Sequence, residues 1–144
     1  MRIVIQRTKN AQVQVNKSVK GQSHYGATLL VCMEKEDSPS TLEKAAKKIL
    51  NARIFEDESG KMNLNISQVN GSILAISQFT LSWRGDKGNR PSFDRSMPPK
   101  EAELLFNKFC SLLSQKVKVE TGEFGASMEV SLTNIGPVTF IFEF

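Results

Sequence analysis

The 144-residue sequence predicts one α+β domain, since its length suffices for a single hydrophobic core. Three observations support this class. Apolar and polar residues alternate in residues 2–6 and 11–15, as they do in half-buried strands. Residues 28–33 form a continuous apolar run, which is typical of a buried strand. Two further segments, residues 40–50 and 98–115, carry apolar residues at helical spacing.

The N-terminal strands are predicted from two short alternating patterns. Ile3 and Ile5 lie on one face of the first strand, and Val13 and Val15 repeat this pattern in a second strand. Asn16-Lys17-Ser18 then has the polar composition of a hairpin turn. We expect the chain to be interrupted once more at His24-Tyr25-Gly26, before the buried strand of residues 28–33.

The first helix is predicted to begin at Ser40, because Ser40 and Glu43 have the spacing of a capping box. Its apolar residues recur at i, i+3, i+4, i+7 and i+8, which makes one stripe along the helix. The stripe consists of Leu42, Ala45, Ala46, Ile49 and Leu50. We expect this face to lie on a sheet.

The middle of the chain is predicted as turns and strands. Residues 56–60 form a polar turn, and residues 61–65 return as a short strand. Asn70-Gly71 is the strongest short-range turn signal in the sequence. Residues 72–81 follow as a second buried strand.

The C-terminal part begins with residues 82–98, which lack periodicity. A loop of this length inside a compact domain is usually functional or disordered. A second helix is predicted from Pro98-Pro99 to about Gln115, with an inner face of Leu105, Phe109, Leu112 and Leu113. A strand follows from Val117, residues 121–125 turn, and two closing strands flank a turn at residues 133–139.

Composition excludes several classes of protein. No stretch approaches the run of about 18 apolar residues that a membrane span requires, and no leader sequence is visible, so a cytoplasmic protein is expected. The net charge of +4 is too small to predict a polyanionic partner by itself. Cys32 and Cys110 both lie in apolar surroundings, which favours two buried free thiols over a disulfide or a ligand pair.

The usual catalytic residues are scarce. His24 is the single histidine, and because no motif surrounds it a surface or structural role is favoured. One histidine and two distant cysteines do not supply a metal site, and no nucleotide-binding fingerprint is present, so no metal or cofactor is expected. The acidic residues 56–58 occupy adjacent turn positions, which indicates a solvated loop.

Two short motifs stand out. Ser77-Gln78-Phe79-Thr80 places polar side chains directly after a buried strand, where at least one must face inward or the strand must bulge. Gly136-Pro137 sits between two apolar runs and combines a permissive residue with one that tolerates a cis peptide bond. From the residues alone, an ordinary strand end and an ordinary hairpin turn remain alternatives.

Together these motifs resemble the D-aminoacyl-tRNA deacylase family. Ser77-Gln78-Phe79-Thr80 is followed about fifty residues later by Asn134-Ile135-Gly136-Pro137-Val138-Thr139. The resemblance extends over the whole chain, 1–144, as one domain. It is also carried by Ile5-Gln6-Arg7, Arg53-Ile54-Phe55-Glu56-Asp57, Gly60-Lys61-Met62-Asn63-Leu64, Arg90-Pro91-Ser92-Phe93, Gly122-Glu123-Phe124-Gly125-Ala126 and Met128-Glu129-Val130-Ser131-Leu132.

The resemblance implies a fold and an assembly. The expected fold has mixed, largely antiparallel β-sheets that form a barrel-like core, with two main helices packed outside. The expected assembly is a homodimer in which a cis Gly136-Pro137 peptide reaches into the partner's site, where Ser77, Gln78, Phe79 and Thr80 lie. Arg7 resembles the arginine that braces this dipeptide.

The resemblance also implies an activity. The expected reaction is hydrolysis of the ester that joins a D-amino acid to the 3' end of tRNA, with L-residues rejected and glycine not excluded. Phe79, Phe124 and Met128 would be pocket walls around the terminal adenosine. Thr80 as a nucleophile is one mechanism, but no neighbouring base is evident. In the other, the adenosine 2'-hydroxyl helps to activate water while Gln78 and nearby backbone N–H groups stabilise the oxyanion.

Several residues leave alternatives open. Arg84, Lys87, Arg90 and Arg95 are candidate tRNA phosphate contacts, with a solvated loop as the alternative. Ser82-Trp83-Arg84, Cys32-Met33 and Glu123 depart from the pattern expected of the family. Rival functions are a non-catalytic nucleic-acid-binding or synthetase-appended module, and a relative that edits L-alanine or glycine with a trans glycine-proline bond.

Overall fold

The computed structural model describes residues 1–85 and 88–144. Its main sheet contains six strands: β1 (Arg2–Val15), β2 (Ser18–Ser23), β3 (Gly26–Cys32), β6 (Ser72–Ser77), β7 (Lys118–Thr121) and β8 (Glu129–Glu143). A small two-stranded sheet is formed by β4 (Phe55–Glu56) and β5 (Met62–Leu64). The helices are α1 (Pro39–Asn51), α2 (Pro99–Ser114) and the short 3-10 helix η1 (Phe79–Ser82).

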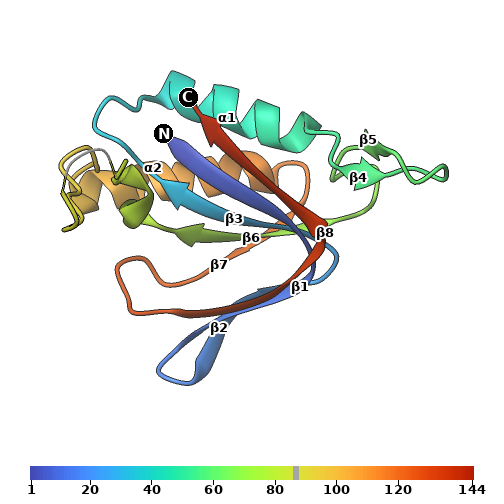
Figure 1. Cartoon of the computed structure of the whole chain (residues 1–144), viewed down its shortest axis with the longest axis horizontal. Coiled ribbons are helices and arrows are strands. Elements are labelled where there is room, and N and C mark those ends of the chain that lie inside the picture. Colours follow the sequence, from blue (N-terminus) through green and yellow to red (C-terminus); the bar gives the residue numbers. More distant parts are fainter. Residues whose placement is uncertain (86–87) are drawn as a thin grey trace.

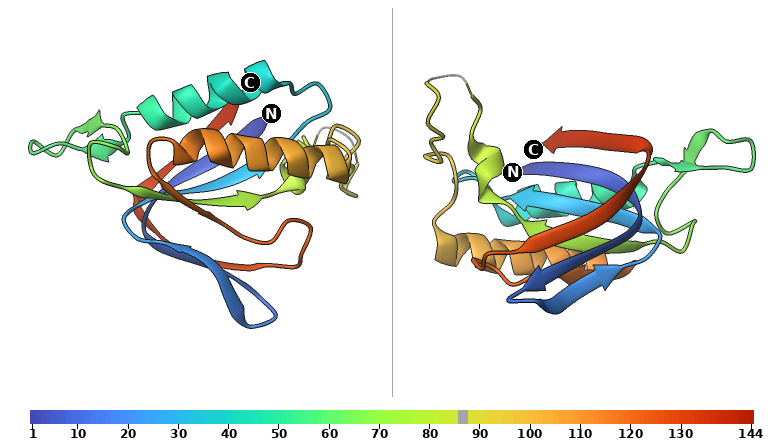
Figure 2. Two further views of the ribbon diagram at one scale, coloured as in Figure 1. Left: turned by 180° about the vertical axis from the view of Figure 1, so that it is seen from behind. Right: turned by 60° about the horizontal axis from the view of Figure 1, so that its bottom comes forward.

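The main sheet is mixed and nearly closes into a barrel. Its strand order is β2-β1-β3-β6-β7, and β8 pairs with β1. The pairs of β1 with β2, β3 and β8 are antiparallel, whereas β3–β6 and β6–β7 are parallel. The sheet curls so that β2 approaches β7 (Figure 2), and the backbone N–H of Gln22 donates to the Glu120 carboxylate at 2.8 Å. The predicted fold class is confirmed.

Both long helices lie on the same side of the sheet (Figure 1) and cover its main hydrophobic core. The predicted stripe of α1 is confirmed, since Leu42, Ala45, Ala46 and Ile49 are buried and Leu50 is half-buried. In α2, Phe109 and Leu113 are buried as expected, while Leu105 and Leu112 are half-buried and Phe106 and Cys110 also point inward. No helix among the described residues is long and apolar enough to cross a membrane.

The N-terminal segment is one strand and not the predicted two. β1 continues through Arg7 and Thr8, which pair with Ala27 and Gly26 of β3. Both polar side chains are buried, because hydrogen bonds satisfy them inside the protein. The prediction of strands from alternating apolar and polar residues therefore failed at Arg7 and Thr8. The predicted hairpin turn after Val15 is confirmed, and Asn16 adopts a positive φ of 50° there.

Two predicted element boundaries were wrong. The capping box of α1 is built from Ser38 and Thr41, and not from Ser40 and Glu43: the Ser38 N–H donates to Thr41 Oγ1 at 3.2 Å. The strand expected at residues 72–81 ends at Ser77. The Gln78 N–H donates to the Val31 carbonyl at 2.7 Å, and the chain then turns into η1.

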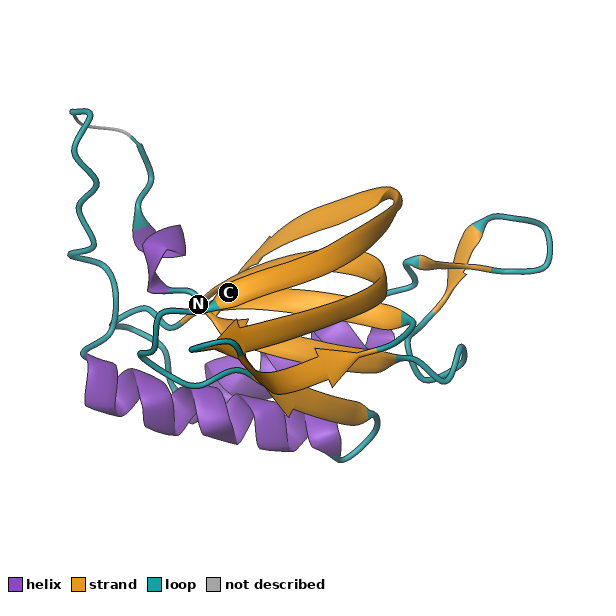
Figure 3. Cartoon of the chain, turned by 90° about the horizontal axis from the view of Figure 1, so that it is seen from below, coloured by secondary structure: helices purple, strands orange, loops and turns teal. Residues whose placement is uncertain are grey.

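The β4–β5 hairpin projects from the end of the sheet opposite η1 (Figures 1 and 3). The predicted polar turn at its tip is confirmed, since Asp57 accepts hydrogen bonds from Ser59 and from the Lys61 N–H. These bonds, the Ser59 hydroxyl foremost, lower the pKa of Asp57. The hairpin is anchored to the rest of the protein at its base, where Phe55 is buried.

The two cysteines are buried and free, as predicted. Burial raises the pKa of the Cys32 thiol to about 11 and that of the Cys110 thiol to about 12. Both thiols are therefore protonated at neutral pH. Since the thiolate is the reactive form, neither cysteine has the character of a catalytic nucleophile.

Candidate active site

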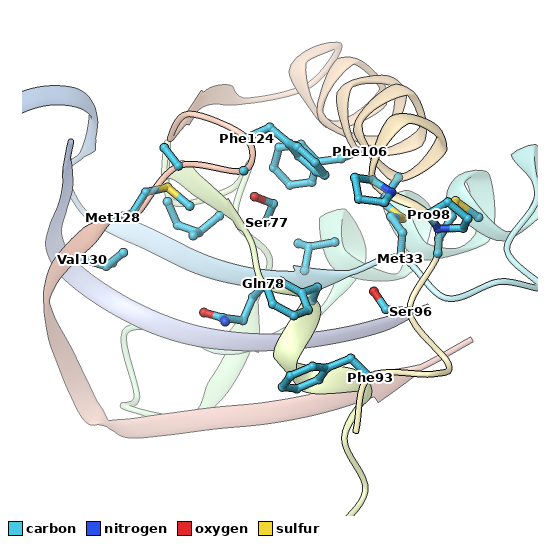
Figure 4. Close-up of a pocket in the computed structure, with 18 residues that line it drawn as sticks. Met33, Ser77, Gln78, Phe93, Ser96, Pro98, Phe106, Phe124, Met128 and Val130 are labelled. Atoms are coloured by element: carbon cyan, nitrogen blue, oxygen red, sulfur yellow. The ribbon is translucent and has the colours of Figure 1, made fainter. Parts of the chain in front are cut away.

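A cavity of about 570 Å³ opens where β6 ends, between η1, the start of α2 and the segment that connects β7 to β8. Figure 4 shows Ser77 inside this cavity, with Phe124 and Met128 on the side of the β7–β8 connection. The lining comes from five parts of the chain, of which the first is the end of β3 with the residue after it (Val31, Met33). The other four follow along the chain. These are the β6–η1 junction (Ile76, Ser77, Gln78, Phe79), the following loop (Phe93, Ser96, Met97), the start of α2 (Pro98, Pro99, Ala102, Phe106), and the β7–β8 connection with the start of β8 (Phe124, Gly125, Ala126, Met128, Val130).

Among the described residues, the lining of this cavity carries no ionisable side chain. Its polar side chains are those of Ser77, Gln78 and Ser96, and the remainder is apolar or aromatic. His24, the single histidine, is exposed at the β2–β3 connection and is not part of the cavity wall. The described part of the wall therefore offers shape, amide groups and hydroxyls for binding.

The β6–η1 junction gathers hydrogen-bonding groups at the cavity. The Gln78 side-chain N–H donates to Thr80 Oγ1 at 2.6 Å. In η1 the first internal bond runs from the Leu81 N–H to the Gln78 carbonyl, so the helix itself does not use the N–H groups of Phe79 and Thr80. Thr80 is exposed and does not line the cavity, but it stands beside Gln78, which does.

Two aromatic pairs frame the cavity. Phe106 and Phe124 lie with their ring centroids 6.0 Å apart on the wall formed by α2 and the β7–β8 connection. Phe79 and Phe93 meet edge to face at 4.9 Å. The structure thus brings together Ser77, Gln78, Phe79, Phe124 and Met128, which the resemblance implied as site residues, leaves Thr80 outside the wall, and adds Phe93 and Phe106.

The Gly136-Pro137 motif lies within β8 and not in a turn between two strands, so the predicted loop tip was wrong. Residue Gln6 of β1 pairs with Thr139, and Thr8 pairs with Asn134. Four residues of β8 therefore stand opposite the single residue Arg7, which makes a large bulge. The Gly136-Pro137 peptide is cis, as expected, and both residues are exposed.

Side chains fix the bulge from within. The Asn134 carboxamide accepts the Val138 N–H at 3.0 Å and donates to Thr139 Oγ1 at 2.9 Å, so it spans the bulge. Gly136 has a φ of 119°, and a Cβ there would stand 2.7 Å from a methyl group of Val138 and 3.1 Å from the Arg7 guanidinium. Glycine is therefore required at this position.

Arg7 braces the bulge, in agreement with the role that the resemblance implied. Its side chain is buried, with 2% of the residue exposed. Its guanidinium donates to the Ile135 carbonyl at 3.3 Å, to the Ile54 carbonyl at 3.1 Å and to the Glu56 carboxylate at 2.9 Å. One rigid fork thus ties the bulge to the base of the β4–β5 hairpin.

The remaining predicted residues are distributed as follows. Arg7, Gly136 and Pro137 do not line the cavity of their own chain. Arg84 is ion-paired with Glu34 at 3.1 Å and with Glu143 at 2.7 Å. Arg90 and Arg95 are exposed on the loop that precedes α2, and Lys87 lies outside the described residues. The loop residues Phe93, Ser96 and Met97 were not predicted as wall, although the length of the aperiodic segment indicated a functional loop.

Comparisons with known proteins agree with this geometry. The family model described as "D-Tyr-tRNA(Tyr) deacylase" matches residues 4–143. A protein of Staphylococcus haemolyticus (strain JCSC1435), named D-aminoacyl-tRNA deacylase, is 51% identical over 144 residues, which cover 99% of this chain and 95% of the relative. A solved structure named "c-Myc DNA Unwinding Element Binding Protein" has a TM-score of 0.94 at 38% identity, covering 99% of this chain and 98% of its own. Another, of a probable eukaryotic D-amino acid tRNA deacylase, has a TM-score of 0.83 at 16% identity over 98% of this chain and 97% of its own, and shows the shared fold alone.

Proposed function

The chain belongs to the D-Tyr-tRNA(Tyr) deacylase family, and from that premise we propose that it hydrolyses the ester between a D-amino acid and the 3' end of tRNA. The observation that carries this is the cavity at the β6–η1 junction, where Gln78 and N–H groups that η1 does not use meet a wall that carries no ionisable side chain among the described residues. Such a wall suits an aminoacyl-tRNA ester, because a hydroxyl of the tRNA's terminal ribose can assist the hydrolysis. The released products are the free D-amino acid and tRNA, and the site of action is the cytoplasm.

The β6–η1 junction is the proposed oxyanion site. As water attacks the ester carbonyl, negative charge develops on its oxygen. The Gln78 side-chain amide and the N–H groups of Phe79 and Thr80 are the proposed donors to that oxygen. The donors act in a cavity lined mainly by apolar groups, where electrostatic stabilisation is stronger than in water.

Thr80 positions the reacting groups and does not attack. Its hydroxyl oxygen accepts a hydrogen bond from Gln78, which lowers its tendency to donate electrons to a carbonyl carbon. Among the described residues, no carboxylate, imidazole or amine is hydrogen-bonded to this hydroxyl. A threonine nucleophile needs such a base. The 2'-hydroxyl of the terminal adenosine therefore takes the role of activating water.

The apolar walls hold the terminal adenosine. Phe79, Phe124 and Met128 line the same cavity as Ser77. Aromatic faces bind nucleobases by stacking, which requires no sequence-specific hydrogen bonds. Arg90 and Arg95, with Arg84 and Lys87 of the same aperiodic segment, are the proposed contacts to tRNA phosphates. Arg84 is already paired with the carboxylates of Glu34 and Glu143, so its guanidinium would have to be shared between these two carboxylates and the phosphate.

Selection of the D-enantiomer is assigned to the bulge of a second protomer in a homodimer. β8 pairs only with β1 among the described strands and carries exposed apolar side chains, including Ile141 at 65% exposure and Phe140 at 40%. An edge strand of this kind favours association with another chain. The exposed Gly136-Pro137 of one protomer would then enter the cavity of its partner, where carbonyl oxygens bind the substrate's α-ammonium group.

This arrangement selects the D-enantiomer by excluding the L-enantiomer from the site. When the α-ammonium group and the ester are both fixed, the side chain of an L-residue collides with the bulge, while that of a D-residue points to open space. D-side chains are therefore distinguished only loosely. Glycine has no side chain to reject, so glycyl-tRNA, including glycine mischarged on tRNA-Ala, is also a substrate.

The proposed function is tested by offering matched aminoacyl-tRNAs to the purified protein. We expect hydrolysis of D-tyrosyl-tRNA and glycyl-tRNA, and no measurable acceleration for L-tyrosyl-tRNA. A D-tyrosyl-tRNA that ends in 2'-deoxyadenosine should be cleaved at least about a hundredfold more slowly, because the 2'-hydroxyl replaces a general base. Equal cleavage of both enantiomers would contradict the selection mechanism, and full cleavage of the deoxy substrate would contradict the role of the ribose.

Sharing of the site between protomers predicts complementation. Gln78→Ala damages the oxyanion site and Gly136→Ala displaces the bulge, so each homodimer should be nearly inactive. When the two variants are dissociated, mixed and reassociated, half of the dimers are hybrids. Each hybrid has one intact site out of two, so about a quarter of the original activity should return. Recovery of no activity from a mixture that forms hybrids would show that the bulge serves its own chain.

A second candidate function is nucleic-acid binding without hydrolysis. It is favoured by the name of the structural relative that binds a DNA unwinding element. The two functions differ in one measurement, because a binding module would shift tRNA or single-stranded DNA in a gel while leaving D-tyrosyl-tRNA intact. We favour the deacylase, since a binder needs neither the oxyanion donors nor the bulge.

A further inference from the structure

A half-buried aromatic ring, that of Phe93, stands at the rim of the cavity and has no part in the hydrolytic step. Phe93 lines the cavity and meets Phe79 edge to face, with ring centroids 4.9 Å apart and an angle of 77° between the rings. Phe79 itself is 56% exposed. A large apolar ring as exposed as that of Phe79, packed against the half-buried ring of Phe93, indicates a contact surface for a ligand that extends beyond the cavity.

Phe93 is held in place by the backbone around it. The Ser96 N–H donates to the Phe93 carbonyl at 2.9 Å, which closes a turn. The segment is fastened to the end of β3 by two further bonds, from the Met97 N–H to the Met33 carbonyl at 3.0 Å and from the Lys35 N–H to the Arg95 carbonyl at 3.1 Å. A ring on such a segment loses little conformational entropy when a ligand stacks on it.

Phe93 lies where a nucleic acid bound in the cavity would leave it. Phe124 and Phe93 lie on opposite sides of the cavity (Figure 4), so a nucleoside bound against Phe124 and Met128 has Phe93 on the way out to solvent. Arg90 and Arg95 are exposed on the same segment, where they can accompany the phosphates. The tRNA end is single-stranded, and single strands are bound by aromatic stacking together with basic residues.

We propose that Phe93 is the stacking platform for the base that precedes the terminal adenosine of the tRNA. This rests on the proposed function, because it requires the terminal adenosine to occupy the cavity. The platform contributes affinity and orientation without reading the identity of the base, since every base offers a π-face. It gives the aperiodic segment before α2 a defined role in substrate recognition.

The experiment uses two short substrates that differ only in the base concerned. One is the D-tyrosyl trinucleotide with the natural tRNA 3' sequence, and the other has an abasic residue at the penultimate position and keeps its phosphate. For the unmodified protein, we expect removal of the base to lower kcat/KM about tenfold. In the Phe93→Leu variant, the two substrates should differ by less than about twofold, because the ring that met the base is gone.

Two control variants make the result specific. Phe93→Tyr keeps a stacking ring and should restore the tenfold difference. Trp83→Leu removes an exposed aromatic residue of the same segment that does not line the cavity, and it should retain the difference in full. Circular dichroism of each variant verifies that it is folded.

The outcomes separate this inference from the function on which it rests. The proposed stacking on Phe93 is contradicted if the unmodified protein hydrolyses the abasic substrate as fast as the natural one. It is also contradicted if Phe93→Leu leaves the tenfold difference intact. If Phe93→Leu slows both substrates equally, Phe93 only supports Phe79, and the platform is again overturned. If the unmodified protein hydrolyses neither trinucleotide nor D-tyrosyl-tRNA, the proposed function itself fails.

Discussion

Replacement of Gln78 by alanine is expected to lower kcat for D-tyrosyl-tRNA roughly 10²- to 10³-fold, the effect of removing one oxyanion donor. KM should change little, because the hydrogen bond strengthens only as charge develops on the ester oxygen. Gln78 lines the cavity and its amide reaches Thr80 Oγ1 at 2.6 Å in the free protein. Single-turnover hydrolysis of labelled D-tyrosyl-tRNA measures the chemical step directly.

Thr80→Val is the matched control for this variant. It removes the hydroxyl partner of Gln78 and keeps the size of the side chain. The proposed role of Thr80 in positioning predicts that the variant retains measurable turnover, with a loss of about tenfold or less. Complete loss of turnover with substrate binding intact would instead identify Thr80 as the nucleophile. An undiminished kcat in Gln78→Ala would show that Gln78 does not stabilise the oxyanion, which contradicts an oxyanion site at the β6–η1 junction.

Replacement of Arg7 by alanine is expected to destabilise the protein by roughly 3 kcal/mol, because it leaves buried carbonyl groups without donors. The guanidinium donates to the buried Ile54 carbonyl and to the part-buried Ile135 carbonyl, while its partner Glu56 is half exposed and contributes less. The loosened bulge should also lower the preference for D- over L-tyrosyl-tRNA by at least about tenfold. Urea unfolding and the ratio of the two hydrolysis rates measure these effects.

Arg53→Ala supplies the comparison for Arg7→Ala. Arg53 also donates to a backbone carbonyl of the β4–β5 hairpin, that of Asn63 at 2.7 Å, but it is exposed. Water can replace that bond, so the free energy of unfolding should change by less than about 0.5 kcal/mol. If Arg7→Ala unfolds more easily yet keeps its full preference for the D-enantiomer, the bulge supports the fold without reading the substrate.

Most elements of the fold could be predicted from hydrophobic spacing, and the exceptions have physical causes. The helices were found because Leu42, Ala46 and Ile49 must all face the sheet. β1 was divided wrongly because Arg7 and Thr8 are polar yet buried, which only their distant hydrogen-bond partners allow. No local pattern contains those partners.

The candidate site was predicted unevenly for the same reason. Ser77, Gln78 and Phe79 are contiguous and were recognised as a motif, and the structure places them on the cavity wall. Phe93 and Ser96 reach the same wall only because the backbone of Met97 is bonded to Met33, a contact between distant segments. The bulge of β8 was taken for a turn, because only pairing with β1 shows that the strand continues through Pro137.

The part of the cavity wall that the structure describes carries no ionisable group, which affects how this protein can be detected and inhibited. Chemical probes that reveal hydrolases by trapping an activated serine or cysteine depend on a reactive residue that this wall does not present. Compounds that imitate the shape of an aminoacylated nucleoside, and bind without forming a covalent bond, are the appropriate starting point for ligands of this site.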